Sequence, residues 1–288
     1  MRILVFGALG EVGTHLTRSF IDRGHVVSPV SSRSEFVDQS VLGFAEAVAL
    51  VDAGSVDLII NAGGRGDQRA VARTGLESTE ALVRARPEHP IPAILISTTR
   101  VLEGHAGLAN ESDPGSATSE YGLVNTGSEN QWLTLSGVKP RVLRLANFFA
   151  EPATVDSGQR KLLPWSLVND ALITGEINVR SDPSVTREFV DSVDIAAALE
   201  LMAELIDSCP TYIATAPGLV LDLGSICECI GKAFESNALP PPKISFGTEH
   251  QAPARVEARW LESMGWKCGL NVNRVTESIS SYLLARKR

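Results

Sequence analysis

Three glycines near the start of the chain, Gly7, Gly10 and Gly13, constrain the fold more than any other feature of the sequence. They follow the apolar, strand-forming residues 1–6 and precede a segment, 14–22, that has the pattern of a helix. Between a strand and a helix, the first glycine permits a tight turn, the second lets a diphosphate approach the backbone, and the third lets helix and strand pack closely. Free N–H groups at the start of the helix then face the anion. The sequence therefore predicts a dinucleotide-binding turn rather than a glycine-rich turn without a ligand.

The end of the second predicted strand, 26–30, bears on which dinucleotide is bound. NAD sites place Asp or Glu about 20 residues after the glycines to accept hydrogen bonds from the ribose hydroxyls, whereas an arginine there suits a 2′-phosphate. This chain has Ser31, Ser32 and Arg33 at that place and no acid before Glu35. The pattern favours NADP over NAD, although an arginine after a strand is also an ordinary solvated residue.

Predicted strands and helices alternate through the first half of the chain. After the strand pattern at 26–30 come a helical pattern at 41–53, a strand pattern at 56–60, a helical pattern at 74–86 and a strand pattern at 91–96. Such alternation, without an internal repeat, is typical of the α/β class with a doubly wound parallel sheet, the Rossmann fold.

Charge and composition argue against several classes of protein. The 288 residues carry 26 basic and 34 acidic side chains, a net charge of −8, which disfavours a nucleic-acid partner or an anionic membrane surface. No apolar run approaches the ~20 residues of a membrane helix. The four cysteines are irregularly spaced, which fits a reducing cytoplasm, and Cys227 and Cys229 lack the further ligands of a metal site. We expect a soluble, cytoplasmic protein without a metal.

The order of motifs resembles the extended short-chain dehydrogenase/reductases, that is, the NAD-dependent epimerase/dehydratase superfamily. Within it, the chain looks most like nucleotide-sugar reductases of the dTDP-4-dehydrorhamnose reductase kind. The resemblance covers nearly the whole chain and is carried by the glycine turn, residues 61–63, residues 97–104, the helix that opens at Tyr121, residues 144–148, residues 186–198 and the tail from Trp260.

The resemblance implies positions for a catalytic site. Thr98 would polarise the substrate carbonyl and Tyr121 would transfer the proton, while Thr99 and Arg187 would contact the substrate. Taken singly, Thr98 and Tyr121 are also ordinary turn and packing residues, but their occurrence in this order favours the functional interpretation. The predicted cofactor-binding residues are Gly7, Leu9, Gly10, Glu11, Val12, Gly13, Ser31, Ser32, Arg33, Asn61, Ala62, Gly63, Leu145 and Asn147.

Position 125 departs from the family pattern. The family has a lysine four residues after the tyrosine, one helical turn along the same face, where its charge favours tyrosinate and its ammonium group binds the nicotinamide ribose. This chain has Asn125, which can donate a hydrogen bond to the ribose but carries no charge. Oxidation of an alcohol needs Tyr121 as a base, whereas reduction of a ketone needs it as an acid. The substitution therefore favours a reductase over an epimerase or dehydratase.

Three functions remain open at this point. The survival of Thr98 and Tyr121 favours NADPH-dependent reduction of a ketone, with a keto-sugar nucleotide as the expected substrate. A catalytically impaired regulatory or sensor protein that binds NAD(P) is the first alternative, since a relative that had lost catalysis would be expected to lack the Tyr–Lys pair. A nucleotide-sugar epimerase or dehydratase is the second. Family members commonly pair through the helices corresponding to 74–86 and 120–135, so we expect a homodimer.

The alternation of strands and helices loosens after Phe148. We assign residues 1–147 to an NAD(P)-binding Rossmann domain with a return at about 187–216, and residues 148–288 mainly to a smaller C-terminal substrate-binding lobe. In that lobe, core packing is favoured for Trp165 over stacking on a sugar or nucleotide base, and an exposed stretch is expected at 247–253. Arg187 is expected to meet substrate phosphates or, as an equal alternative, to pair with Glu188 or Asp191.

Overall fold

The structure is a computed structural model that describes residues 1–31, 41–63, 90–105, 107–152, 162–208, 213–250, 255–258 and 260–286. Several features predicted from the sequence lie outside these residues: Ser32, Arg33, Glu35, the helix at 74–86 and Cys209. No helix in the described ranges is both long and apolar enough to cross a bilayer.

The chain divides into two compact units. Unit 1 comprises Met1–Ala146, Ser192–Pro217 and Ala254–Lys267, and unit 2 comprises Asn147–Asp191, Gly218–Pro253 and Cys268–Arg288. Compared with the division expected from sequence, the chain returns to unit 1 at Ser192 instead of about 187, because β9 (Thr186–Asp191) pairs with strands of unit 2. Unit 1 also takes in residues 254–267, because β13 (Arg255–Glu257) pairs with β5 (Leu108–Asn110).

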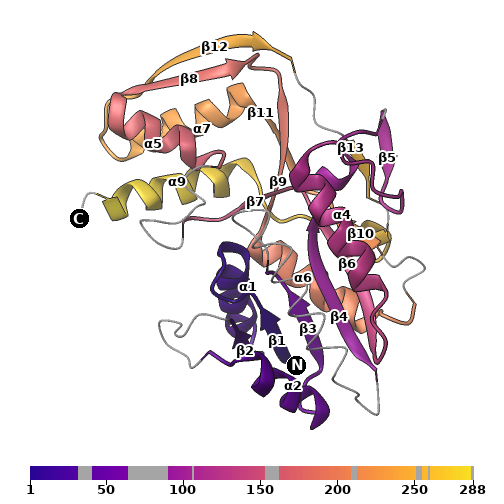
Figure 1. The fold of residues 1–288 in the computed structure, drawn as a ribbon. Coiled ribbons are helices and arrows are strands. Elements are labelled where there is room, and N and C mark those ends of the chain that lie inside the picture. The colour runs from indigo at the N-terminus through magenta and orange to yellow at the C-terminus, as the bar shows by residue number, and fades with distance from the viewer. Residues whose placement is uncertain are drawn as a thin grey trace. The chain divides into compact units, whose positions relative to one another are not determined.

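Unit 1 is built on a six-stranded parallel sheet with the order β10-β6-β4-β3-β1-β2 (Figure 1). β1 pairs with β2 on one side and with β3 on the other, so the strand order reverses at β1, where ligands bind in sheets of this kind. The predicted doubly wound parallel sheet is therefore confirmed. Its strands are β1 (Arg2–Phe6), β2 (Val26–Val30), β3 (Leu58–Asn61), β4 (Ile91–Thr98), β6 (Val138–Leu145) and β10 (Ile213–Ala216).

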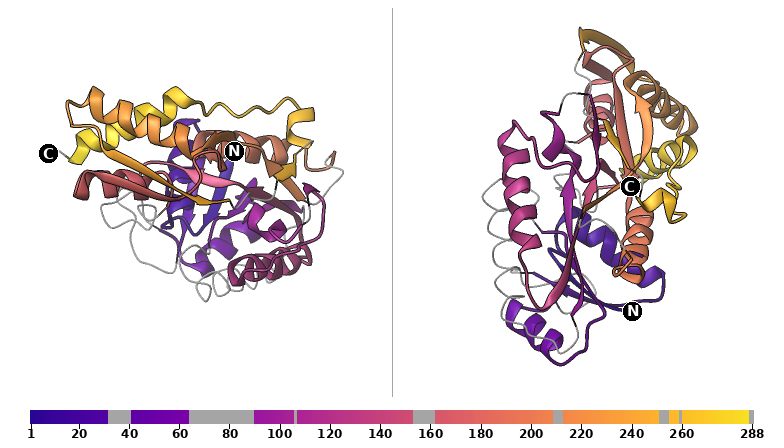
Figure 2. Two further views of the ribbon diagram at one scale, coloured as in Figure 1. Left: turned by 90° about the horizontal axis from the view of Figure 1, so that it is seen from above. Right: turned by 90° about the vertical axis from the view of Figure 1, so that its right-hand side faces the viewer.

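Helices cover both faces of this sheet. Helices α1 and α6 pack together on one face and α4 lies on the other, as the right-hand view of Figure 2 shows. Trp132 fixes α4 to the sheet, because its buried indole N–H donates to the carbonyl oxygen of Ala93 on β4 at 3.1 Å. The helical elements of unit 1 in the described ranges are α1 (Glu11–Asp22), α2 (Phe44–Asp52), the 3-10 helix η1 (Thr99–Leu102), α4 (Glu120–Leu133), α6 (Ser192–Glu204) and α8 (Trp260–Ser263).

The two covered faces explain why the central strands have continuous apolar runs. The last four residues of β1 and all four residues of β3 are buried, so neither strand shows the alternation of a sheet with one face in water. The polar member of the two runs is Asn61, which is fully buried at the carboxyl end of β3.

Unit 2 combines a three-stranded sheet, in the order β11-β9-β7, with a two-stranded sheet of β12 and β8. Trp165 is fully buried and stacks on Phe149, which confirms it as a core residue. Asp222 caps α7 by accepting the N–H of Ser225 at 2.6 Å. Besides β9, the elements of unit 2 in the described ranges are β7 (Asn147–Phe149), α5 (Trp165–Thr174), β8 (Glu176–Ser181), β11 (Leu219–Asp222), α7 (Leu223–Ser236), β12 (Lys243–Glu249) and α9 (Val272–Arg286).

Candidate active site

The glycine turn joins β1 to α1 without room for side chains at two of its three glycines. Gly7 has φ +74°, and a Cβ on it would come within 2.5 Å of Gly63 after β3. A Cβ on Gly13 would collide with the carbonyl oxygen of Gly7, so only glycine lets α1 approach the strand this closely. These are the packing roles that the sequence predicts for the first and third glycine.

Gly10 occupies a different environment. Among the described residues, a Cβ there would meet a single atom within 4 Å, the carbonyl oxygen of Gly7 at 3.2 Å. Gly10 is also the N-cap of α1, so no capping side chain covers the N–H groups of the first helical turn. This backbone cradle, which a Cβ would fill, fits the diphosphate of a dinucleotide. The carboxylate of Glu11 lies 3.5 Å from His15, so we expect Glu11 to meet the cofactor through its backbone.

We expect Gly10→Val to lower the affinity for a nicotinamide dinucleotide by at least about tenfold, which is ~1.4 kcal/mol, because the branched side chain would fill the cradle. Titration of intrinsic fluorescence with NADPH and NADH measures the effect. Gly231→Ala on α7 is the control, since its Cβ would also meet open space but in unit 2. Unchanged affinity in Gly10→Val would contradict a diphosphate site at this turn.

The hydroxyl groups of Ser97 and Thr98, at the carboxyl end of β4, form hydrogen bonds with different partners. Ser97 donates to Glu129 at 2.5 Å, inside the unit. Thr98 is the N-cap of η1, and its oxygen accepts the N–H of Arg100 at 3.2 Å. Because that oxygen already accepts a hydrogen bond from the backbone, the hydroxyl hydrogen is directed to donate elsewhere. The contact of Thr98 with a substrate oxygen stays a prediction.

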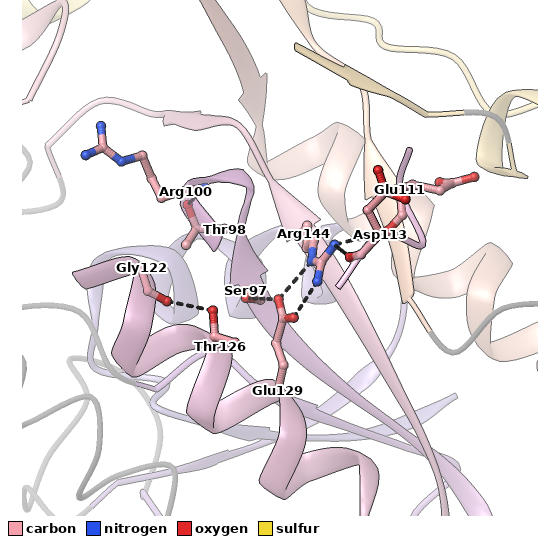
Figure 3. A network of polar contacts seen from close by, with 9 residues as sticks. All are labelled: Ser97, Thr98, Arg100, Glu111, Asp113, Gly122, Thr126, Glu129 and Arg144. Carbon is pink, nitrogen blue, oxygen red and sulfur yellow. Dashed lines mark hydrogen bonds and ion pairs between the residues drawn. The ribbon is translucent and has the colours of Figure 1, made fainter. Parts of the chain in front are cut away.

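Tyr121 lies in the first turn of α4, with 38% of its surface exposed. The next residue, Gly122, is in close contact with η1: a Cβ on it would come within 2.8 Å of the carbonyl oxygen of Arg100. The turn that follows Thr98 and the turn that carries Tyr121 therefore touch (Figure 3). Sequence analysis missed Gly122, although a glycine directly after the candidate tyrosine was a visible signal.

Glu103 lies between the same two turns. Its Oε1 accepts the N–H groups of Ser119 and Thr118, the latter at 3.2 Å, and its Oε2 lies 2.8 Å from Nη2 of Arg100. Burial acts to raise the pKa of Glu103, but the hydrogen bonds from Ser119, together with the charge of Arg100, outweigh it and hold the pKa below its ordinary value. Glu103 is therefore an ionised acceptor at neutral pH.

Asn125 is buried, and its side chain bonds to its own helix. Its Nδ2 donates to the carbonyl oxygen of Tyr121 at 2.8 Å. The amide thus occupies the position of the expected lysine but brings no charge to the first turn of α4. Its predicted contact with a cofactor ribose stays a prediction.

One helical turn further on, Glu129 is part of a buried network around Arg144 (Figure 3). The side chains are 3% and 1% exposed, with Nε to Oε1 at 3.0 Å and Nη2 to Oε2 at 2.7 Å. Nη1 of Arg144 also donates to the carbonyl oxygens of Glu111 and Asp113, at 3.2 and 3.0 Å. One guanidinium group therefore ties β6, α4 and the loop before α4 together beneath the end of β4.

The carboxylate of Glu111 extends this network. It accepts the N–H of Thr215 on β10 at 3.2 Å and the N–H of Trp260 on α8 at 2.8 Å. Glu111 is therefore a structural residue that joins three separate stretches of unit 1. Sequence analysis did not find the pairing of Arg144 with Glu129, because nothing local to either residue indicates the other.

The other predicted cofactor residues lie on several elements. Ala62 and Gly63 follow β3, where Asn61 accepts the N–H of Gly63 at 3.0 Å, next to the glycine turn. The N–H of Ser31 donates to Leu42 at 3.2 Å. Leu9 and Val12 belong to the turn and first helical turn, and Leu145 ends β6. Because Ser32 and Arg33 lie outside the described residues, the preference for NADP stays a prediction.

Two predicted residues lie in unit 2. Asn147 begins β7 and donates to the carbonyl oxygen of Glu188 at 2.9 Å. Arg187 lies on β9 and donates to the carbonyl oxygen of Thr186 at 2.8 Å. Of the two acids proposed as alternative partners of Arg187, Glu188 accepts the N–H of Gly218 at 2.6 Å and Asp191 pairs with Arg274 at 2.5 Å. Both predicted roles of Arg187 stay predictions. Thr99, the other predicted substrate residue, begins η1 in unit 1.

The cysteines and other metal-ligating side chains of the described ranges form no cluster. No group of three or more His, Cys, Asp or Glu side chains there is arranged to hold a metal ion. Cys227 and Cys229 are buried on α7, and burial, with a contribution from Cys229, raises the pKa of the Cys227 thiol to about 11. A thiol with that pKa stays protonated and is a poor nucleophile at neutral pH.

Comparison with known proteins places the chain in a family. The model of the NAD dependent epimerase/dehydratase family matches residues 3–214, whereas no curated protein sequence matches the chain. Among solved structures, it is similar to MoeE5 in complex with UDP-glucose and NAD (TM-score 0.76, 17% identity, 100% of each chain covered). A UDP-glucose-4-epimerase from Stenotrophomonas maltophila with bound NAD and formylated UDP-arabinopyranose aligns over 100% of this chain and 99% of its own (TM-score 0.77, 16% identity).

A third solved structure, a dTDP-glucose 4,6-dehydratase from Bacillus anthracis in complex with NAD, aligns over 100% of this chain and 98% of its own (TM-score 0.74, 14% identity). At these identities the structures establish the shared fold, and the family model, which spans most of the chain, establishes the relationship. The chain belongs to the NAD dependent epimerase/dehydratase family.

Proposed function

We propose that the protein reduces a ketone on a nucleotide-sugar substrate, with a nicotinamide dinucleotide, NADPH in preference to NADH, as hydride donor. The family supports a nicotinamide-dependent enzyme, and relatives solved with UDP-glucose or a UDP-pentose support a nucleotide sugar. The narrower assignment, which matches the dTDP-4-dehydrorhamnose reductase kind, depends on one observation. Position 125 carries an uncharged amide that is bonded to the carbonyl oxygen of Tyr121.

The side chains at the carboxyl end of β4 have distinct parts in this reaction. The glycine turn, Gly7 to Gly13, would hold the diphosphate of the cofactor, which when bound would supply hydride for the carbonyl carbon. The Thr98 hydroxyl donates a hydrogen bond to the carbonyl oxygen, which stabilises the negative charge that develops there. Tyr121 then gives its proton to that oxygen, so that the ketone becomes a secondary alcohol.

An epimerase or dehydratase is the second candidate, favoured by the family and by relatives such as UDP-glucose-4-epimerase and dTDP-glucose 4,6-dehydratase. Oxidation of the sugar as a first step needs the tyrosine as a base, and a positive charge beside it would assist that step. Asn125 provides no such charge. The third candidate, a sensor that binds cofactor without turnover, is favoured by the same substitution.

The test is Asn125→Lys, assayed in both directions with keto-sugar nucleotides and the corresponding alcohols. We expect kcat for alcohol oxidation to rise more than kcat for ketone reduction. The ratio of the two should rise on the order of tenfold for each pKa unit by which the lysine favours tyrosinate. The Michaelis constants must change in compensation, since the overall equilibrium is fixed.

Asn130→Lys is the matched control, because it makes the same change at an exposed position of the same helix. Equal gains in both directions would count against the reductase assignment. Tight cofactor binding without turnover of any keto-sugar by the unmodified protein would favour the sensor instead.

A further inference from the structure

The two hydroxyl groups assigned to proton transfer and carbonyl polarisation come from different elements. Thr98 ends β4 and Tyr121 lies in the first turn of α4, so the distance between the two hydroxyls depends on how η1 meets that helix. A displacement of about 1 Å between such groups costs on the order of 100-fold in rate. The contacts that fix η1 against α4 are therefore as important to the chemistry as the hydroxyls themselves.

One carboxylate, that of Glu103, bonds to both sides of this junction. On the η1 side it pairs with Arg100, whose own N–H donates to Thr98. On the α4 side it accepts the N–H of Ser119, the N-cap residue, whose side chain in turn accepts the N–H of Gly122 at 3.2 Å. A continuous set of hydrogen bonds thus runs from Thr98 to the residue next to Tyr121, with Glu103 at its centre.

The surrounding contacts leave little room for movement. Gly104 donates to Ser116 at 3.0 Å, and Ser116 donates to Val101 at 2.8 Å, so the loop before α4 is also bonded to η1 through its backbone. Gly122 has no space for even a methyl group between Arg100 and Ala117. Glu103 supplies the charged bonds of this junction, which are the stronger kind.

We propose that Glu103 is a positioning residue that holds the Thr98 turn against the Tyr121 turn and so sets the geometry of proton transfer. This inference rests on the proposed function. Glu103 does not act as the acid or base itself, because both of its oxygens are engaged, one by two N–H groups of the α4 start and the other by Arg100. Its effect reaches the substrate through Thr98 and Tyr121.

The experiment compares Glu103→Ala and Glu103→Gln with Glu46→Gln. Glu46 is the matched control, because its carboxylate also accepts a backbone N–H at a helix start, that of Gly43 at 2.7 Å, but on α2. Three quantities are measured on each full-length variant: kcat and KM for ketone reduction, the affinity and stoichiometry of NADPH binding, and hydrogen exchange of the amides at residues 119–123.

For Glu103→Ala we expect kcat to fall on the order of 10- to 100-fold, with NADPH stoichiometry unchanged and affinity within about threefold, because the glycine turn is a separate contact. Amides at the start of α4 should exchange at least about tenfold faster. Glu103→Gln retains an oxygen that accepts the Ser119 N–H, so it should recover part of the lost kcat. Glu46→Gln should behave as the unmodified protein in all three measurements.

The inference would be overturned by unchanged amide exchange at 119–123 in Glu103→Ala, or by faster exchange with unchanged kcat. A fall in NADPH stoichiometry that accounts for the whole loss of kcat would also overturn it, since that indicates partial unfolding. If the unmodified protein binds NADPH but reduces no ketone, the proposed function fails, and the exchange data alone then decide whether Glu103 holds the junction.

Discussion

Tyr121→Phe is expected to lower kcat for ketone reduction by about 10²- to 10⁴-fold, the range by which a positioned acid accelerates such reactions. The change removes one oxygen from a residue that is 38% exposed, and within the described part of the chain no hydrogen bond of that hydroxyl is lost. The unfolding midpoint and the affinity for NADPH should therefore change little. Loss of turnover with retained cofactor binding would identify the phenol as the proton donor.

Tyr282→Phe is the matched control for this prediction. Its hydroxyl lies in unit 2 and donates to Asn169 at 3.0 Å in a buried contact, so its removal should lower stability and leave kcat unchanged. A loss of kcat smaller than about tenfold in Tyr121→Phe would be less than a general acid usually contributes. Such a result would mean that the proton comes from another group.

Arg144→Ala is expected to destabilise the protein by about 3 to 5 kcal/mol, because it leaves the Glu129 carboxylate buried without its partner. The carbonyl oxygens of Glu111 and Asp113 lose their donor at the same time. Urea unfolding, followed by tryptophan fluorescence, gives the midpoint and slope from which the change is obtained. We expect a similar loss for Glu129→Ala, since the guanidinium group is then the uncompensated charge.

The double variant Arg144→Met/Glu129→Leu tests whether the loss of stability comes from an unpaired buried charge or from loss of the ion pair itself. Replacing both charges by apolar side chains should be less destabilising than either single change, because no unpaired charge remains. Lys139→Ala is the surface comparison, since the Lys139–Asp207 pair is 34% and 76% exposed and should contribute little. Equal losses for the buried and the exposed pair would contradict the importance of the network.

Sequence was most informative where the determinants are local. The strand, glycine turn and helix at the start of the chain are specified by adjacent residues, and the structure has them with the expected tight packing at Gly7 and Gly13. The doubly wound sheet follows from the alternation of apolar runs with helical patterns, and the runs in β1 and β3 are buried on both faces. The family resemblance is confirmed at the level of the family.

Sequence was least informative where the contacts are distant or the pattern is weak. The pairing of Arg144 with Glu129 joins a strand and a helix, and the Glu111 carboxylate reaches Thr215 and Trp260 much later in the chain. β12 (Lys243–Glu249) alternates polar and apolar residues only over 243–246, which is a short pattern, and its last residues overlap the stretch expected only to be exposed. The reductase subtype and the preference for NADP remain predictions.

The two backbone contacts of the Glu111 carboxylate limit where the chain can be truncated without loss of structure in unit 1. A gene fragment that stops after β6 would supply this carboxylate but neither of its two amide donors, which come from residues 215 and 260. Unit 1 therefore has the full set of bonds at Glu111 only after residue 260 has been synthesised. On the ribosome, we expect this unit to reach its folded state after that point and not when β6 emerges.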